Sequence, residues 1–259
     1  MGAVDIGPLQ LGLCVVFVLC SGLCSLALKL KLERDLMIGA VRTFAQLYLM
    51  GYVLRFVFGL SQAWPVLIIF CGMIFFAAWT IRGRIEERTV PFFQSTLVSM
   101  LVTYVVVTVT VTGVIVQAKP WYLPQYFIPL GGMVVGNSMN AIAVALDRLF
   151  SELRNRRAEV EMMLCLGADY REATQSIMAN AVRAGMIPSI NAMMGVGIVF
   201  LPGMMTGQIL AGSDPVLAIK YQIVVMLMLT ASTALGSVVV VWLARKNCFT
   251  HAQQLKLGE

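Results

Sequence analysis

Several residues that could contact a solute, some of them polar, lie within otherwise apolar stretches of the chain. They are Arg42, Gln46, Asn137, Asn140, and the run Pro202-Gly203-Met204-Met205 with Gln208 after it. Arginine and asparagine are costly in lipid unless they are paired, so these residues either hold helices together or line a polar pathway. Both interpretations stay open for Asn137 and Asn140. Pro202-Gly203 should bend or break a helix, and the freed carbonyls could contact a polar solute or a metal ion.

The sulfur-bearing residues do not identify a metal. Cys20 and Cys24 are one helical turn apart, and with Met204 and Met205 they would suit Cu(I) better than hard iron. A methionine pair is, however, more typical of gap-filling packing. None of the six cysteines forms a CxxC pair, so we expect neither a disulfide framework nor a zinc site. The metal ligands, if any, stay unknown.

Groups for catalysis are scarce. The only histidine is His251, and none of the thirteen carboxylates lies deep within an apolar stretch. No nucleophile–base or metal-ligand set is visible, which argues against a membrane enzyme. No phosphate-binding loop of the Gly-x-x-x-x-Gly-Lys-Ser/Thr type occurs. We therefore expect no cofactor on this chain, and any ATP-Mg should bind to a separate partner subunit.

The composition predicts that a lipid bilayer surrounds these residues. Of the 259 residues, 59% are hydrophobic and 12% are charged, whereas a soluble domain carries about 25% charged residues. Stretches of about 20 apolar residues are long enough to cross a membrane as helices. Seven such stretches are predicted: Leu9–Leu28, Leu36–Phe58, Trp64–Ile81, Phe92–Gln117, Gln125–Leu146, Ile187–Leu210 and Val216–Leu243. The expected fold is an all-α, polytopic membrane helix bundle, with residues 1–259 forming one domain.

The basic residues predict the orientation. Fifteen of the nineteen lysines and arginines fall in alternate connections, after the first, third, fifth and seventh stretches. The positive-inside rule places these connections in the cytoplasm, the N-terminus outside and the C-terminus inside. The net charge of +6 is thereby explained by topology, and no nucleic acid partner is expected.

One predicted cytoplasmic connection, at about residues 147–186, is long. Leu149, Leu153, Val160 and Leu164 recur at helical spacing and predict an amphipathic helix. Gly167 should end this helix, and a second helical stretch should run through Ala173 and Ile177 toward Pro188. The interfacial helix of a membrane protein would give the same pattern.

The run from Glu161 to Ile177 resembles the cytoplasmic coupling loop of ABC transporter permeases. Glutamate is followed six residues later by glycine and ten residues after that by Ile177. The family's Ala-Ala and Leu-Pro are replaced by Met162-Met163 and Ala179-Asn180. On this resemblance, Glu161, Gly167, Ala168, Ala173 and Ile177 would contact an ATPase.

A more specific resemblance covers about Leu32 to Leu243. Arg42-x-x-x-Gln46 with Gly51-Tyr-Val-Leu54, the Leu201-Pro-Gly-Met-Met205 string and Asp214-Pro-x-x-Ala-Ile-Lys-Tyr-Gln222 resemble the FetB-type ABC permeases. Bacterial members of that family are linked to iron export and plant relatives to aluminium tolerance. The resemblance implies a multi-pass permease of the bacterial inner (plasma) membrane, acting as a homodimer with a cytoplasmic ABC ATPase and exporting a metal ion, iron by resemblance. A partner-free metal-ion channel or facilitator is the alternative.

Overall fold

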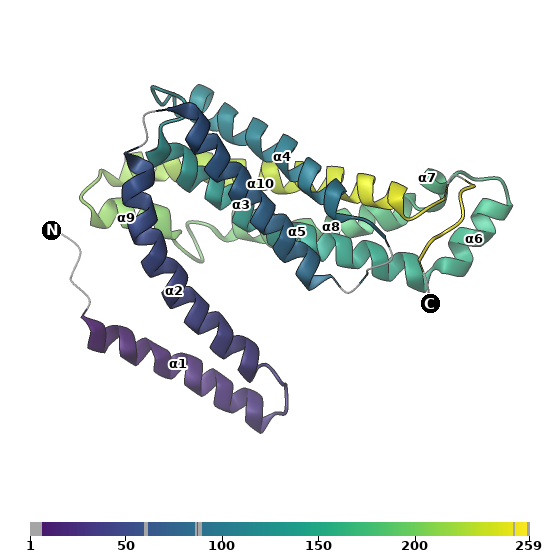
Figure 1. Cartoon of the computed structure of the whole chain (residues 1–259), viewed down its shortest axis with the longest axis horizontal. Helices are drawn as coiled ribbons and strands as arrows, with labels where there is room; N and C mark the ends of the chain where they lie inside the picture. The colour runs from purple at the N-terminus through teal and green to yellow at the C-terminus, as the bar shows by residue number, and fades with distance from the viewer. Residues whose placement is uncertain (1–6, 60–61, 86, 88–89, 251, 258–259) are drawn as a thin grey trace. The chain divides into compact units, whose positions relative to one another are not determined.

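The computed structural model describes residues 7–59, 62–85, 87, 90–250 and 252–257. It is helical, and two isolated β-bridges are the only extended pairings among these residues. The elements are α1 (Pro8–Ala27), α2 (Glu33–Phe58), α3 (Ala63–Arg84), α4 (Phe93–Thr110) with a π-turn at Val111–Ile115, α5 (Pro124–Asn155), α6 (Arg157–Cys165), α7 (Tyr170–Ala173), α8 (Gln175–Gly195), α9 (Gly203–Leu210) and α10 (Pro215–Asn247). They form two compact units: residues 1–60 with 210–212, and residues 61–209 with 213–259 (Figure 1).

Six of the described helices are long and apolar enough to cross a membrane. These are α1, α2, α3, α4 with its π-turn, α5 and α10, and each overlaps a predicted stretch. The expectation of an all-helical, polytopic membrane bundle is therefore confirmed. Helix α5 extends nine residues beyond the predicted end at Leu146, because the apolar face continues through Leu149 and Leu153, which are both fully buried.

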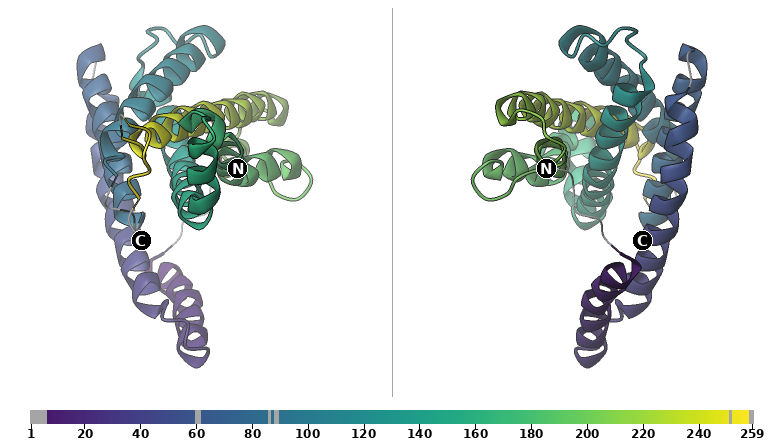
Figure 2. Two further views of the ribbon diagram at one scale, coloured as in Figure 1. Left: turned by 90° about the vertical axis from the view of Figure 1, so that its right-hand side faces the viewer. Right: turned by 90° about the vertical axis from the view of Figure 1, so that its left-hand side faces the viewer.

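The first unit is a hairpin of α1 and α2 (Figure 2). Ser25 fixes the turn, because its Oγ accepts a hydrogen bond from the Leu32 amide at 2.9 Å and donates one to Glu33 Oε2 at 2.9 Å. Apolar side chains lie exposed on this hairpin, for example Phe17 and Tyr52. Such a surface suits lipid or another membrane-embedded partner rather than water.

In the second unit, α5, α8 and α10 pack against one another, and α8 runs antiparallel to the other two (Figures 1 and 2). Asn180 at the start of α8 donates to Glu152 Oε2 at the end of α5, at 3.2 Å. Further along α8, a Cβ at Gly185 would lie 2.6 Å from the Ala141 carbonyl oxygen, so the two backbones are in close contact there. Small residues permit this approach between membrane helices.

Buried hydroxyl groups join α4, α5 and α10. Ser138 Oγ lies 3.4 Å from both Ser232 Oγ and Thr233 Oγ1, and Ser99 Oγ donates to the Gly236 carbonyl at 3.3 Å. Hydrogen bonds between serine and threonine side chains are a common means of joining helices in lipid. Together with the α5–α8 contact, they define the core of the second unit.

The predicted span over Ile187–Leu210 is not one continuous helix. Helix α8 begins earlier, at Gln175, and ends at Gly195, and the chain then runs without helix to Gly203. Two local causes are visible: Gly197 adopts a positive φ of 83°, and Pro202 has no amide proton to donate. The break that Pro202-Gly203 predicted is therefore present, and it divides the stretch into two helices.

The single amphipathic helix predicted from Leu149 to Leu164 is also two helices. Leu149 and Leu153 belong to α5, whereas Val160 and Leu164 belong to α6. Arg156 separates the two with φ −106° and ψ 24°, outside the helical region. Its guanidinium is held by Glu159 through Nε–H···Oε2 at 2.8 Å, which fixes the bend.

Candidate functional site

Gly167 ends α6 in the conformation that only glycine adopts at low cost. Its φ is +96°, in the left-handed region. The Ala168 amide donates to the Met163 carbonyl at 3.1 Å and the Gly167 amide to the Leu164 carbonyl at 3.1 Å. This pair of bonds is the Schellman pattern, which satisfies the last carbonyls of a helix and reverses the chain direction. The predicted helix–turn–helix is thus present, and Gly167 is its turn.

Charged residues form stabilising contacts in both helices that flank this turn. On α6, Arg157 Nε donates to Glu161 Oε1 at 2.7 Å, one helical turn away. After the turn, Asp169 Oδ1 accepts from the Glu172 amide at 2.7 Å, while Glu172 Oε2 accepts from the Asp169 amide at 3.1 Å. That reciprocal capping box starts α7. At the start of α6, the hydrogen bond from Arg156 holds the pKa of Glu159 below its usual range, so this pair stays ionised near neutral pH.

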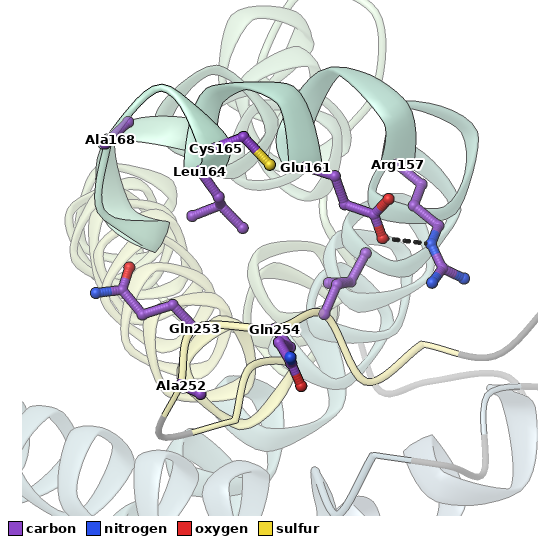
Figure 3. Close-up of a pocket in the computed structure, with 10 residues that line it drawn as sticks. Arg157, Glu161, Leu164, Cys165, Ala168, Ala252, Gln253 and Gln254 are labelled. Carbon is purple, nitrogen blue, oxygen red and sulfur yellow. Dashed lines mark hydrogen bonds and ion pairs between the residues drawn. The ribbon is translucent and has the colours of Figure 1, made fainter.

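A groove of about 820 Å³ lies beside the turn, between α6 and the C-terminal tail, which comprises the described residues 248–250 and 252–257 (Figure 3). Glu161, Leu164 and Cys165 project from α6 toward it, and Gln253 and Gln254 border it from the tail. Gly167 and Ala168 complete the rim. Both polar and apolar side chains line this groove, which suits a protein segment better than a single small ion.

The C-terminal tail is folded back onto α6 and α7. The Lys256 amide donates to the Cys248 carbonyl at 2.8 Å, and Phe249 packs on Tyr170 with ring centroids 5.4 Å apart. Gln253 Oε1 accepts from the Tyr170 amide at 3.0 Å, and Arg157 Nη1 donates to the Leu257 carbonyl at 3.3 Å. The tail therefore links the end of α10 to the turn at Gly167.

The five predicted coupling residues fall into two groups. Glu161, Gly167 and Ala168 line the groove, and Glu161 is paired with Arg157. Ala173 and Ile177 are buried, with 5% and 0% of their surface exposed, and they anchor the turn to the bundle. The structure thus places the first three at a surface and the last two in the packing beneath it.

A second cavity, of about 400 Å³, lies at the break between α8 and α9. Its lining includes Pro202, which precedes α9, Met205, which lies on α9, and Gln222, which lies on α10. The Gln222 side chain is 6% exposed, and within the described part of the chain its Oε1 has no hydrogen-bond partner. Of the predicted pathway residues, the structure brings Pro202 and Met205 together here.

The other predicted pathway residues lie elsewhere. Gly203 and Met204 are the first residues of α9, and Gln208, on the same helix, has a buried Oε1 that is unpartnered among the described residues. Asn140 Oδ1, on α5, accepts from Arg84 Nη1 at 2.8 Å. The remaining three are exposed: Asn137 on α5, and Arg42 and Gln46 on α2 in the first unit.

Comparison with known proteins places this arrangement in a family. Residues 8–249 match the model of a family described as "Uncharacterised protein family (UPF0014)". The chain belongs to the UPF0014 family. The match covers both units and ends two residues beyond α10.

Three relatives illustrate the breadth of the UPF0014 family. The "UPF0014 membrane protein slr1647" of Synechocystis is 39% identical, over 87% of this chain and 87% of the relative. The "Probable iron export permease protein FetB" of Escherichia coli is 31% identical, over 95% and 93%. The "Protein ALUMINUM SENSITIVE 3" of Arabidopsis thaliana is 31% identical, over 93% and 87%. No solved structure matches the chain. With six apolar helices and relatives named membrane proteins, this UPF0014 member is a multi-pass membrane protein.

Sequence reasoning missed two parts of the site in this UPF0014 member. The tail contributes Ala252, Gln253, Gln254 and Leu255 to the groove, and its only signal in the sequence is the alternation of Leu255 and Leu257. Gln222 was part of a matching string but carried no predicted role. Both depend on contacts between residues far apart in the chain, which local patterns do not reveal.

Proposed function

We propose that this protein is the membrane-spanning permease subunit of an ATP-driven exporter of a metal ion, with iron as the expected ion. The name of the Escherichia coli relative supports both the permease role and the substrate. The similarity to that relative extends over 95% of this chain and 93% of the relative. ATP-Mg would bind to a separate cytoplasmic ATPase, and the expected location is the bacterial plasma membrane.

The observation that carries this proposal is the turn at Gly167 and its attachment to the bundle. Helix α6 follows α5 after a single residue, Arg156, and α7 leads into α8 after a single residue, Thr174. Because α5 and α8 are in backbone contact near Gly185, a force on the turn at Gly167 would act directly on these two helices. A partner ATPase that moves the turn could therefore shift α8 against α5 and α10, and with it the break beside Pro202.

Helix direction supports seven crossings, with the N-terminus outside and the C-terminus in the cytoplasm. Helix α8 is antiparallel to α5 and to α10: Tyr170, before α8, packs on Phe249 after α10, and Thr230 of α10 donates to Met193 Sδ at 3.8 Å near the end of α8. Helices α5 and α10 therefore cross in the same direction. The chain between them must return through the membrane, so α8 and α9 together would form an interrupted crossing, the sixth of seven along the chain.

The same break supports a homodimer. Ile198 and Val199 in the non-helical segment are 90% and 80% exposed. Irregular backbone at membrane depth is tolerated only where protein or a water-filled cavity covers it. A second copy of the chain would supply this cover. A molar mass of two copies after subtraction of detergent, from light scattering on the purified protein, is the expected result, and a strictly monomeric mass would contradict it.

Transport in sealed inside-out vesicles tests the function. Uptake of Fe²⁺ that requires the permease, its ATPase and ATP is the expected result, because inside-out vesicles turn export into uptake. Fe²⁺ flux without the ATPase would instead favour the partner-free channel. ATP-dependent loss of Fe²⁺ from preloaded vesicles would reverse the direction to import.

The substitution Gly167→Pro tests the coupling role. Proline removes the amide that donates to Leu164 and cannot adopt a φ of +96°. We expect the variant to insert into the membrane but to lose stimulation of the ATPase and transport together. Leu166→Ala is the matched control, because Leu166 is 80% exposed on the same turn. Normal stimulation and transport in Gly167→Pro would show that the turn is not the coupling element.

A further inference from the structure

A third, smaller pocket borders the C-terminal tail next to the end of α10. Its volume is about 340 Å³, and it is bounded by the last turn of α10, the tail and Tyr170. Lys246 and Lys256 approach it from α10 and from the tail, and Asn247 and Thr250 add polar groups. Among the described residues that line it, none is a carboxylate.

The lysines of this pocket have no acidic partner within the described part of the chain. Neither Lys246 nor Lys256 forms an ion pair there, and both are exposed. The nearby carboxylates are already engaged: Asp169 caps α7 through the Glu172 amide at 2.7 Å, and Glu87 pairs with Arg154 at 2.7 Å. Within the described part of the chain, both lysines of the pocket are therefore without an ion-pair partner.

A third cation lies buried beneath it. Arg245 is 3% exposed, and neither its Nε nor its Nη1 has a hydrogen-bond partner among the described residues. Its guanidinium carbon lies 5.9 Å from the ring centroid of Tyr170, one of the residues that line the pocket. A buried guanidinium with unmade hydrogen bonds is costly, and an anion next to it would reduce that cost.

Aromatic residues place this pocket at the level of the lipid headgroups. Trp242, one turn before Lys246 on α10, is 45% exposed. Trp79, also exposed, lies against Arg82 at the end of α3, with 5.9 Å between the guanidinium carbon and the ring centroid. Tryptophan concentrates at the boundary between hydrocarbon and headgroups. A cationic pocket at that depth faces the phosphate layer of the bilayer.

We propose that this pocket binds a phosphate group, with an anionic phospholipid as the expected carrier. Lys246 and Lys256 would contact the phosphate oxygens, while buried Arg245 adds positive charge behind them. Basic pockets on the cytoplasmic side of membrane proteins bind anionic headgroups in this way. Gln253 borders both this pocket and the groove beside α6, so a bound lipid would also hold the tail against the turn at Gly167. The binding itself does not depend on the proposed transport function.

Native mass spectrometry of the full-length protein in a neutral detergent tests the proposal. Phosphatidylglycerol is titrated against phosphatidylcholine with the same acyl chains, and inorganic phosphate is added as a competitor in a separate arm. A basic residue near an anionic surface contributes about 1 kcal/mol, so Lys246→Gln with Lys256→Gln should weaken phosphatidylglycerol binding roughly 30-fold. Lys220→Gln is the matched control, because Lys220 is an exposed lysine near the opposite end of α10.

The outcomes separate the possible occupants. Preferential binding of phosphatidylglycerol that the double variant loses and Lys220→Gln keeps supports the proposal. Displacement of that lipid by millimolar phosphate also supports a phosphate site and identifies the free anion as a competing ligand. Equal phosphatidylglycerol binding by the double variant, or no preference over phosphatidylcholine, overturns the proposal. Loss of ATPase co-purification without any lipid effect overturns it too, because the lysines would then contact a protein.

Discussion

The close contact between α5 and α8 makes Gly185→Ala the sharpest test of the packing. The added Cβ would lie 2.6 Å from the Ala141 carbonyl oxygen and 3.0 Å from the Ala145 Cβ. A carbon–oxygen contact needs about 3.3 Å, so the helices would have to separate by roughly 0.7 Å. The obstacle is backbone of the neighbouring helix rather than a mobile side chain, so it cannot rotate away.

We estimate the cost from the usual penalty for overpacking. Extra atoms in a packed core cost about 1–3 kcal/mol. For a chain of this size, each kcal/mol lowers the melting temperature by about 2–4 °C, so a cost of about 2 kcal/mol predicts a decrease of roughly 4–8 °C. Thermal unfolding of the purified protein in detergent, followed by intrinsic fluorescence, measures this decrease.

Gly136→Ala on α5 is the matched control. A Cβ at Gly136 would meet no atom within 4 Å, and alanine favours helix more than glycine does by about 1 kcal/mol. We expect no loss of stability in this variant. An unchanged melting temperature in Gly185→Ala would refute the close contact. An equal decrease in both variants would refute the assignment of the effect to Ala141.

Two further predictions concern the tail and the membrane crossings. Burial raises the pKa of the Cys248 thiol to about 12, so maleimide at pH 8 should label exposed Cys165 but spare Cys248 until the protein is denatured, and mass spectrometry of the peptides measures this. Rapid labelling of Cys248 in the folded protein would contradict its burial. Because the raised pKa favours the neutral thiol in the folded state, the contribution of Cys248 to stability should be lost as the pH rises above about 9 toward 12. For the crossings, a reporter inserted at Ser213 should be active outside the cell and one at Leu30 inside, whereas a cytoplasmic Ser213 would exclude the interrupted crossing.

The long apolar helices could be predicted from the sequence because lipid imposes a length and a composition on each span. The turn at Gly167 could also be predicted, since a change in helical periodicity coincides with a residue that tolerates a positive φ. The end of α5 was missed because Leu149 and Leu153 continue its apolar face past the expected membrane boundary. The break between α8 and α9 was predicted at Pro202, but the end of α8 at Gly195 was not, because the positive φ of Gly197 is only one of the conformations that glycine permits.

The candidate site was predictable only in part. Glu161, Gly167 and Ala168 are close in sequence and meet at the groove, because a single turn brings them together. Gln253 and Gln254 reach the same groove from more than eighty residues away, through a tail whose course depends on contacts with Tyr170 that no local pattern reveals. The buried position of Arg245 was equally hidden, because its sequence context is the ordinary basic end of a membrane helix.

The proposed interrupted crossing would have a consequence for how the protein is made. Helix α8 is not among the described helices that are apolar enough to enter a membrane by composition; its place between α5 and α10 comes from packing. During synthesis it should therefore remain at the membrane surface until α10 has emerged from the ribosome, and the two should then insert together. A nascent chain that stops before α10 would hold the Pro202 segment on the wrong side of the bilayer and expose it to quality-control proteases.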